Sequence, residues 1–309
     1  MSYRVLCLMG PTCSGKTVLA LSLCEVLPLE IISVDSAMVY RGLDIGTAKP
    51  SLALRNRITH HLIDIRDPAE IYSAGQFCED ARRLIELISK KGKLPLLVGG
   101  TFLYFRALQQ GLASLPSKND EVRKILMDRM QKQGLASLYQ DLCYCDKISA
   151  ERINPHDPQR IIRALEVYQL TGKPLSEYGY KNEFLSNYEM LNVGLMPQRA
   201  WLHQKIEERF KSMLEQGFIE EVEALFQRKD LNENLPSIKS VGYRQAWQYL
   251  LGKINYETMV EKTVVATRQL AKRQFTWLRH WPNLRVFSSG CPEEVIKFFK
   301  DQDWARKPK

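Results

Sequence analysis

The chain has 309 residues, with 44 lysines and arginines against 35 aspartates and glutamates, and therefore a net charge of +9 at pH 7. Its length favours one large domain that carries a smaller one, and its content of 45% hydrophobic and 26% charged residues excludes wholesale disorder. The excess positive charge suits a polyanionic partner, although many proteins are as basic without one.

The sequence also argues against the membrane and secreted classes of protein. No apolar run reaches the about 18–20 residues of a membrane span, and the start of the chain lacks the apolar stretch of a signal peptide. The seven cysteines are an odd number scattered through apolar segments, which is a poor framework for disulfides. Cys143 and Cys145 form a C-x-C pair, but no second pair completes the about four ligands of a zinc site. We therefore expect a cytoplasmic protein with free thiols and no membrane partner.

The first third of the chain alternates between predicted strands and predicted helices. Short apolar runs predict strands at 3–9, 30–34, 61–65 and 94–98. The segment 17–27 predicts a helix, and Ser73 with Gln76 forms a capping box that opens a second helix, which ends at Gly92. Strands separated by helices pair in parallel through crossover connections, so this part predicts a doubly wound sheet.

The middle of the chain, from about 115 to 188, contains predicted helices and loops but no convincing strand. One helix begins at Asp157 and Pro158, an N-cap followed by a proline in the first turn, and ends near Gly172. The polar segment 179–187 predicts a mobile loop.

The last third of the chain returns to the sheet. Strands are predicted at 193–196 and 284–287, and helices at 199–216, 257–281 and 293–300. The predicted fold class is therefore α/β. It has a P-loop NTPase-like, doubly wound parallel sheet core formed by residues 1–113 and 191–309, with an all-helical domain inserted at 114–190.

A glycine-rich segment follows the first predicted strand and fits the pattern G-x-x-x-x-G-K-[ST] at every fixed position. It consists of Gly10, Pro11, Thr12, Cys13, Ser14, Gly15, Lys16 and Thr17. Backbone amides of such a loop, together with the N-terminus of the following helix, surround a phosphate. Lys16 adds a full positive charge, and the hydroxyl of Thr17 is a ligand for Mg²⁺. The segment predicts a loop that binds a diphosphate or triphosphate, without naming the reaction.

Two further residues are expected beside this loop. A nucleotide hydrolase would be expected to carry a metal-binding aspartate on the strand 94–98, but that strand ends in Gly99, Gly100 and Thr101. The acidic residue that closes a strand is instead Asp35. Because the carboxyl ends of parallel strands line the ligand crevice, Asp35 and Thr101 are expected near the loop. A carboxylate there can take a proton from an acceptor nucleophile, although Asp35 could equally cap a turn.

Longer motifs give the chain a family resemblance. Besides the phosphate loop they are 33–36, 40–50, 60–64, 98–101 with 103–104, 154–157, 159–161 with 163–166, 242–245, and 267–274 with 277–279. In this order they resemble the motifs of the bacterial tRNA dimethylallyltransferases, also called tRNA isopentenyltransferases, from Gly10 to about Arg279. The run 40–50, YRGLDIGTAKP, is far more specific than the phosphate loop alone.

The resemblance implies a reaction. A dimethylallyl group passes from dimethylallyl diphosphate to N6 of the adenosine 3′ to the anticodon, position 37, in tRNAs that read codons starting with U, which gives i6A and diphosphate. Asp35 is then the general base, Thr101 helps to hold the diphosphate, and the phosphate loop with Mg²⁺ stabilises the leaving group. The implied partners are dimethylallyl diphosphate and a tRNA anticodon stem-loop, which binds the inserted domain, and the family implies a monomer.

The chain departs from the family pattern at three positions. Cys13 stands where relatives usually have a small residue, Met38 where many have glutamine, and Phe102 where many have glycine. A thiol at the start of a helix is a candidate for activation by its surroundings. We therefore expect alkylation of Cys13 to interfere with the phosphate site.

The resemblance also assigns residues to tRNA binding. They are Asp35, Ser36, Ala37, Met38, Thr101, Arg123, Gln159, Arg160, Ile161, Ile162, Arg163, Gly242, Tyr243, Arg244, Gln245, Arg268, Lys272 and Arg279. The stretch 159–163 would meet a flipped adenosine and its neighbours. The assignment of 242–245 is weaker, because Tyr243 could equally pack in the core.

Helical periodicity supports part of this set independently of the resemblance. At about 100° per residue, Arg268, Lys272 and Arg279 fall within a stripe about 40° wide, with Phe275 among them. Few acidic residues occur from 263 to 286. The row could therefore follow a phosphate backbone.

Three other functions remain open on the residues alone. A P-loop small-molecule kinase also places a carboxylate after its second strand, and it would transfer phosphate from ATP. An adenine-nucleotide isopentenyltransferase shares the prenyl chemistry but needs no RNA-contacting helix such as the one after Asp157. A non-enzymatic RNA-binding P-loop protein would not depend on Asp35.

Overall fold

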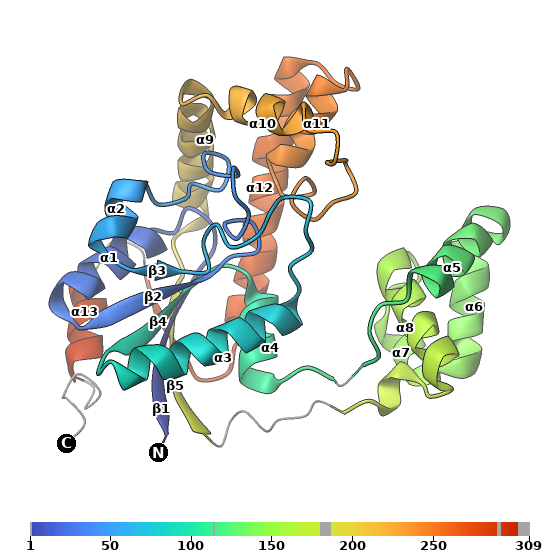
Figure 1. Cartoon of the computed structure of the whole chain (residues 1–309), viewed down its shortest axis with the longest axis horizontal. Coiled ribbons are helices and arrows are strands. Elements are labelled where there is room, and N and C mark those ends of the chain that lie inside the picture. The colour runs from blue at the N-terminus through green and yellow to red at the C-terminus, as the bar shows by residue number, and fades with distance from the viewer. Residues whose placement is uncertain (1, 114, 180–186, 289–291, 302–309) are drawn as a thin grey trace. The chain divides into compact units, whose positions relative to one another are not determined.

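The computed structural model describes residues 2–113, 115–179, 187–288 and 292–301 (Figure 1). The chain divides into two compact units. The first combines Met1–Gln109 with Phe184–Lys309, and the second is Gln110–Glu183.

A six-stranded sheet forms the centre of the first unit, with the strand order β3-β2-β4-β1-β5-β6 (Figure 1). Its strands are β1 Tyr3–Met9, β2 Leu29–Val34, β3 His60–His61, β4 Leu94–Gly99, β5 Tyr188–Leu195 and β6 Leu284–Phe287. Every neighbouring pair is parallel. The predicted α/β class with a parallel sheet is therefore confirmed.

Two strands differ from the sequence-based expectation. The strand expected at 61–65 is reduced to the two residues of β3, because Leu62 and Asp64 adopt positive φ angles of 61° and 58° that end the extended backbone. β5 begins earlier than expected, since Tyr188 pairs with Tyr3 of β1. The expected boundary between 190 and 191 therefore falls inside a strand, and 188–190 belong to the sheet.

Helices cover both faces of the sheet. They are α1 Lys16–Val26, α2 Leu52–Arg57, α3 Ala74–Lys90, α4 Phe102–Gln110, α9 Arg199–Glu215, α10 Phe218–Phe226, α11 Tyr243–Leu250, α12 Tyr256–Arg279 and α13 Pro292–Asp301. Leu6 and Leu8 of β1 pack in one apolar cluster with α1 and α13, while Cys7 and Met9 pack in another with α3, α4 and α10–α12. Because side chains alternate along a strand, β1 joins two cores and the sheet is doubly wound (Figure 1).

Local signals in the sequence explain where α3 begins. The backbone N–H of Gln76 donates to Ser73 Oγ at 3.2 Å, and the N–H of Ser73 donates to Gln76 Oε1 at 2.8 Å. This capping box satisfies two amides that a helix start leaves unpaired. The predicted apolar face is buried through Phe77, Ala81 and Ile85, which holds α3 on the sheet.

The secondary-structure elements described in the second unit are all helical, and loops connect them. It consists of α5 Asp120–Gln133, α6 Leu135–Cys145, α7 Lys147–Arg152, α8 Pro158–Thr171 and the 3₁₀ turn Leu175–Glu177. Asp157 caps α8 as predicted, by accepting the N–H of Arg160 at 3.1 Å, and Gly172 ends it with φ 68°. The helices share a core of their own. Most of the expected loop 179–187 lies outside the described residues.

No helix within the described ranges is long and apolar enough to cross a membrane.

A glycine at the end of β4 offers a test of this packing. A Cβ added at Gly99 would overlap the carbonyl oxygen of Val34 on β2, so Gly99→Ala must push the two strands apart. We expect it to lower the free energy of unfolding by about 3 kcal/mol or more. Gly179 has open space around its Cβ position, and Gly179→Ala is the matched control, expected to leave the urea midpoint unchanged. Equal midpoints for both variants would contradict this account of the β2–β4 contact.

Candidate phosphate-binding and acceptor site

The loop between β1 and α1 has the curled backbone that its sequence predicts. Two of its residues have left-handed φ angles, Cys13 at 62° and Gly15 at 86°, and the N–H of Ser14 donates to Pro11 O at 3.3 Å. The turn ends where α1 begins at Lys16, so the first amides of that helix face the loop. Such a set of amides is a site for an anion.

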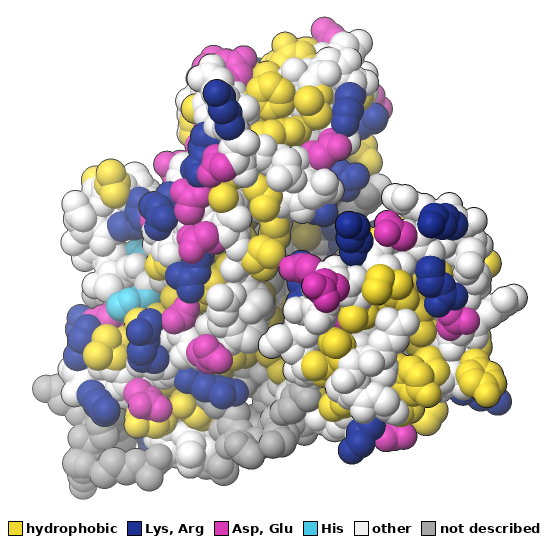
Figure 2. Space-filling view, turned by 45° about the vertical axis from the view of Figure 1, so that its right-hand side comes forward, with side chains coloured by type: hydrophobic (Ala, Val, Ile, Leu, Met, Phe, Trp, Pro, Cys, Tyr) yellow, Lys and Arg dark blue, Asp and Glu magenta, His cyan; other side chains and the backbone are white. Residues whose placement is uncertain are grey.

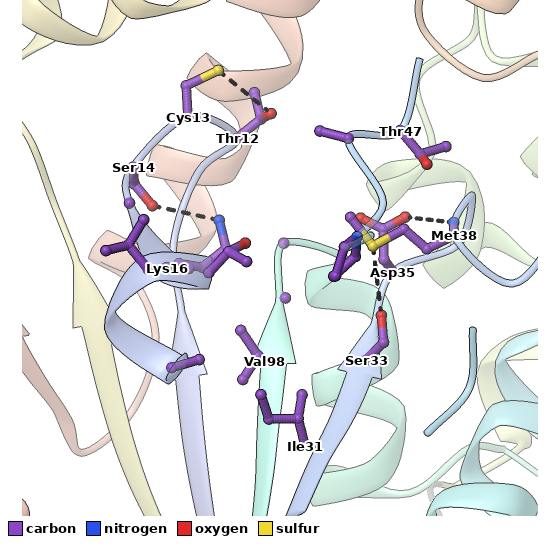
Figure 3. Close-up of a pocket in the computed structure, with 18 of the residues that line it drawn as sticks. Thr12, Cys13, Ser14, Lys16, Ile31, Ser33, Asp35, Met38, Thr47 and Val98 are labelled. Carbon is purple, nitrogen blue, oxygen red and sulfur yellow. Dashed lines mark hydrogen bonds between the residues drawn. The ribbon is translucent and has the colours of Figure 1, made fainter. Parts of the chain in front are cut away.

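Lys16 folds back over this loop (Figure 3). Its Nζ donates to Pro11 O at 2.5 Å and to Ser14 Oγ at 3.4 Å. Burial lowers the pKa of Lys16 to about 8, the charge of Asp35 opposes that shift, and the charge of Arg209 adds to it. The loop therefore holds a desolvated cation whose charge an anion would stabilise.

Asp35 and Thr101 lie together, as predicted from the ends of two neighbouring strands. Asp35 Oδ1 accepts the backbone N–H groups of Ala37 at 2.8 Å and Met38 at 3.2 Å. Thr101 Oγ1 accepts the N–H of Ser36 at 3.1 Å. Asp35 therefore does cap a turn, but only through Oδ1, and Oδ2 has no hydrogen-bond partner among the described residues. Figure 3 shows this carboxylate facing the Lys16 side of the cavity.

Two adjoining cavities meet at these residues. The first, of about 210 Å³, is lined by the phosphate loop together with Asp35, Met38 and Thr47. The second, of about 420 Å³, shares Asp35 and extends along an apolar wall. That wall consists of Ile206, Phe210, Met213, Phe218, Leu270 and Trp277. The arrangement provides a cationic end for phosphate and an apolar end for a hydrocarbon or a base.

Sequence reasoning missed two residues that line both cavities, Arg209 and Gln274. Arg209 donates to Thr12 Oγ1 at 3.2 Å and to Thr47 O at 3.3 Å. Both residues interrupt an otherwise apolar helix face, three positions after Ile206 in α9 and after Ala271 in α12. A polar residue at a core position is a signal of a buried polar contact, and it could have identified them.

The first cavity offers Mg²⁺ few protein ligands. Thr17 lines it with a hydroxyl, and Asp35 is its single acidic lining residue. Across the described chain no three His, Cys, Asp or Glu side chains are grouped to hold a metal ion. Mg²⁺ keeps several waters and takes further ligands from substrate phosphates, so one protein hydroxyl fits it.

Two arginines of the helical unit have a structural partner. Arg123 donates from Nε and Nη2 to Glu166 at 3.0 Å each, and Arg163 donates to the same carboxylate at 2.7 Å. Glu166 is fully buried. Burial alone would raise its pKa, but the hydrogen bonds from the two arginines lower it. Arg123 and Arg163 are thus held in fixed positions rather than extended freely into solvent.

The remaining residues of this stretch divide by exposure. Ile161 and Ile162 are buried in the core of the helical unit, so their side chains are not on the surface. Gln159 and Arg160 are exposed, and Arg160 pairs with Asp157 at 3.2 Å. Of the residues 159–163, therefore, Gln159 and Arg160 are the exposed ones.

The segment 242–245, which begins α11, is largely structural. Tyr243 is fully buried, and its hydroxyl donates to Glu221 Oε1 at 2.5 Å, so core packing is the observed role of its side chain. The side-chain amide of Gln245 accepts the N–H of Gly242 at 2.9 Å, which caps the helix. Only Arg244 of this segment is exposed. Gly242 and Tyr243 both line the second cavity.

The basic stripe on α12 is interrupted. Lys272 and Arg279 are exposed, but Arg268 forms an ion pair with Glu207 of α9, an acidic partner from outside the segment. Phe275 was expected among the basic residues, and this is wrong, because it is buried against α9. In Figure 2, basic and acidic side chains are interspersed over the visible face.

Comparison with known proteins identifies relatives over nearly the whole chain. The model of the family "IPP transferase" matches residues 38–281. A tRNA dimethylallyltransferase of Coxiella burnetii is 54% identical over 301 residues, which cover 96% of this chain and 97% of the relative. One from Legionella pneumophila is 54% identical over 290 residues, which cover 94% and 93%.

Solved structures agree with the sequence relatives. The tRNA isopentenylpyrophosphate transferase of Bacillus halodurans is 33% identical, with a TM-score of 0.71 and coverage of 96% of both chains. A eukaryotic dimethylallyltransferase, described as acting on tRNA, is 25% identical with a TM-score of 0.75, and the match covers 99% of this chain and 77% of that one.

The depressed pKa of Lys16 predicts a pH dependence. Above about pH 8 the charged form is lost, so the Kd for inorganic diphosphate should rise by up to about tenfold per pH unit. Lys16→Arg retains its charge throughout this range and is the control, because titration of diphosphate itself affects both proteins equally. Calorimetric titrations at pH 7, 8 and 9 measure the difference. Parallel pH profiles for the two proteins would contradict the assignment.

Cys13 lines both cavities and predicts sensitivity to a thiol reagent. Carbamidomethylation there should abolish diphosphate binding by filling the loop, and diphosphate should protect the thiol. Cys13→Ala should bind diphosphate before and after treatment, even though the exposed Cys143 is modified in both proteins. Complete labelling of Cys13, verified by mass spectrometry, with an unchanged Kd would refute the prediction.

Proposed function

Because the chain belongs to the IPP transferase family, we propose that it transfers the dimethylallyl group of dimethylallyl diphosphate to N6 of the adenosine 3′ to the anticodon, position 37, of tRNA, which gives i6A. Apart from membership of this family, one structural observation supports the proposal. A cationic phosphate loop and a carboxylate meet in a cavity that continues along an apolar wall. We propose tRNAs that read codons starting with U as substrates, and a monomer acting in the cytoplasm.

The chemistry at the leaving group needs only charge stabilisation. The bond from C1 of the dimethylallyl group to the diphosphate oxygen breaks, and its electron pair leaves with diphosphate. The residues of the loop, including Lys16, line the first cavity together with Arg209, and they would stabilise the charge that develops on that oxygen. Mg²⁺ held by Thr17 and phosphate oxygens would supply further positive charge. The loop thus holds a leaving group, and no nucleotide is hydrolysed.

The acceptor is a weak nucleophile, because the lone pair of an adenine amine is delocalised into the ring. As the bond from N6 to C1 forms, N6 must lose a proton. Asp35 would take it through Oδ2, since Oδ1 already accepts two backbone amides. Those two hydrogen bonds fix the orientation of the carboxylate. Thr101, which accepts the N–H of Ser36, holds the same turn, lines the second cavity and would border the diphosphate.

The tRNA contributes a base that must leave its stack to enter a cavity. Exposed basic and polar residues suited to the sugar–phosphate backbone are Gln159, Arg160, Arg244, Lys272 and Arg279. Arg123, Arg163 and Arg268 would contribute while paired with acids. The flipped base would meet the residues that line the cavities, which are 35–38, 101 and 242. The binding surfaces would be supported by the packing of Ile161, Ile162 and Tyr243 and by the cap that Gln245 forms.

A transfer assay tests this function and separates it from the alternatives. The purified chain is incubated with Mg²⁺, labelled dimethylallyl diphosphate and either tRNA or AMP. Label should enter tRNA alone. Label in AMP alone would indicate an adenine-nucleotide isopentenyltransferase, and phosphate transfer from γ-labelled ATP would indicate a kinase. An absence of any transfer would favour a binding protein.

Asp35→Asn isolates the proton acceptor. The asparagine oxygen can still accept the amides of Ala37 and Met38, so the turn is kept while the base is removed. We expect kcat to fall by about 10²- to 10⁴-fold, with the Kd for tRNA within about twofold of wild type. Asp128→Asn, at an exposed position, is the matched control and should keep full activity. A kcat for Asp35→Asn close to that of the control would exclude Asp35 as the base.

A further inference from the structure

One side-chain amide connects two loops of the site. Gln274 of α12 accepts the backbone N–H of Thr12 through Oε1 at 2.9 Å, and its Nε2 donates to Gly100 O at 2.9 Å. Thr12 belongs to the phosphate loop, and Gly100 belongs to the connection between β4 and α4. The side chain is almost fully buried, at 7% exposure, so both of its polar atoms depend on these partners.

The β4–α4 connection leaves room for this contact because residue 100 is a glycine. A Cβ added at Gly100 would overlap Gln274 Nε2, so only glycine allows the amide to approach at this position. Gln274 also lines both cavities, at the place where they adjoin. The amide therefore lies between the cationic end and the apolar end of the site.

Further hydrogen bonds connect Gly100 to the turn that carries the carboxylate. Gly100 precedes Thr101, whose Oγ1 accepts the N–H of Ser36, and Ser36 follows Asp35. Thr101 is held further by its own N–H, which donates to Val34 O at 3.2 Å. A connected path of hydrogen bonds and backbone thus leads from Thr12, through the side chains of Gln274 and Thr101, to the turn that carries Asp35.

We propose that Gln274 is a positioning residue that fixes the phosphate loop against the Thr101 turn and so aligns the leaving diphosphate with Asp35. The inference rests on the proposed function. The reacting C1 must lie in line between the diphosphate oxygen and N6, and each of these is held by a different loop. A displacement of about 1 Å between reacting groups can cost about 10²-fold in rate. An amide that joins the two loops directly limits that displacement.

The test compares three substitutions on the same helix. Gln274→Leu removes both hydrogen bonds at similar volume. Gln274→Glu keeps the acceptor for Thr12 but loses the donor to Gly100, and it keeps the protein testable if the leucine variant does not fold. Gln269→Leu replaces an exposed glutamine five residues earlier and is the matched control. For each protein, kcat, the KM for tRNA, the single-turnover amplitude and hydrogen exchange of peptides covering 10–17 are measured.

Positioning predicts a distinctive combination of results. For Gln274→Leu and Gln274→Glu we expect kcat to fall by about 10- to 100-fold, while the KM for tRNA and the single-turnover amplitude stay within about twofold. Exchange at the Thr12 amide should accelerate in the leucine variant alone, because glutamate still accepts that N–H. Gln269→Leu should match wild type throughout.

Two outcomes would overturn the proposal. One is a kcat within twofold of wild type for either Gln274 variant. The other is a loss of activity that matches a loss of single-turnover amplitude, which would show fewer folded molecules instead of misaligned ones. If wild type itself transfers no dimethylallyl group, the proposed function fails separately. Exchange at Thr12 then still decides whether Gln274 restrains the loop, and unchanged protection in Gln274→Leu overturns that claim.

Discussion

The parallel pairing of β1, β2 and β4 is the constraint on which the site depends. In a parallel sheet every strand ends at the same edge, so the loops after these three strands meet although they are far apart in the sequence. The loop after β1 carries Lys16, the turn after β2 carries Asp35, and the connection after β4 carries Thr101. Successive buried side chains of β1 enter two different apolar cores, which anchors this edge and gives the loops a rigid base.

The C-terminal half completes what the strands begin. Helices α9 and α12 pack against each other through Leu202, Ile206 and Phe275, and they present Arg209 and Gln274 toward the phosphate loop. The apolar wall of the second cavity comes mainly from the same part of the chain. Glu221 of α10 accepts the backbone N–H groups of residues 44–46, which fixes the loop that carries Thr47 at the edge of both cavities.

Much of the fold and the centre of the site were predictable from sequence, because their signals are local. The phosphate loop lies in one contiguous motif, and the ends of short apolar strands indicate where Asp35 and Thr101 meet. Arg209 and Gln274 were missed because their partners are 197 and 262 residues away, at Thr12. Phe275 was wrongly expected on an exposed face. Helical periodicity shows which residues share a face of α12, but it does not show how many other elements pack against that helix. α12 packs on the sheet side through Leu278 and on α9 through Phe275.

The hydrogen bond from Lys16 to Pro11 has a consequence for turnover. This lysine has an acceptor within its own loop, so a diphosphate that accepts from Lys16 competes with the Pro11 carbonyl. A hydrogen bond from a charged group contributes about 1.5–3 kcal/mol, and this competition lowers the affinity for substrate and product alike. A P-loop hydrolase weakens its own ligand by splitting it. A transferase that ejects an intact diphosphate has no such step, and an internal competitor for the lysine gives it a route to product release.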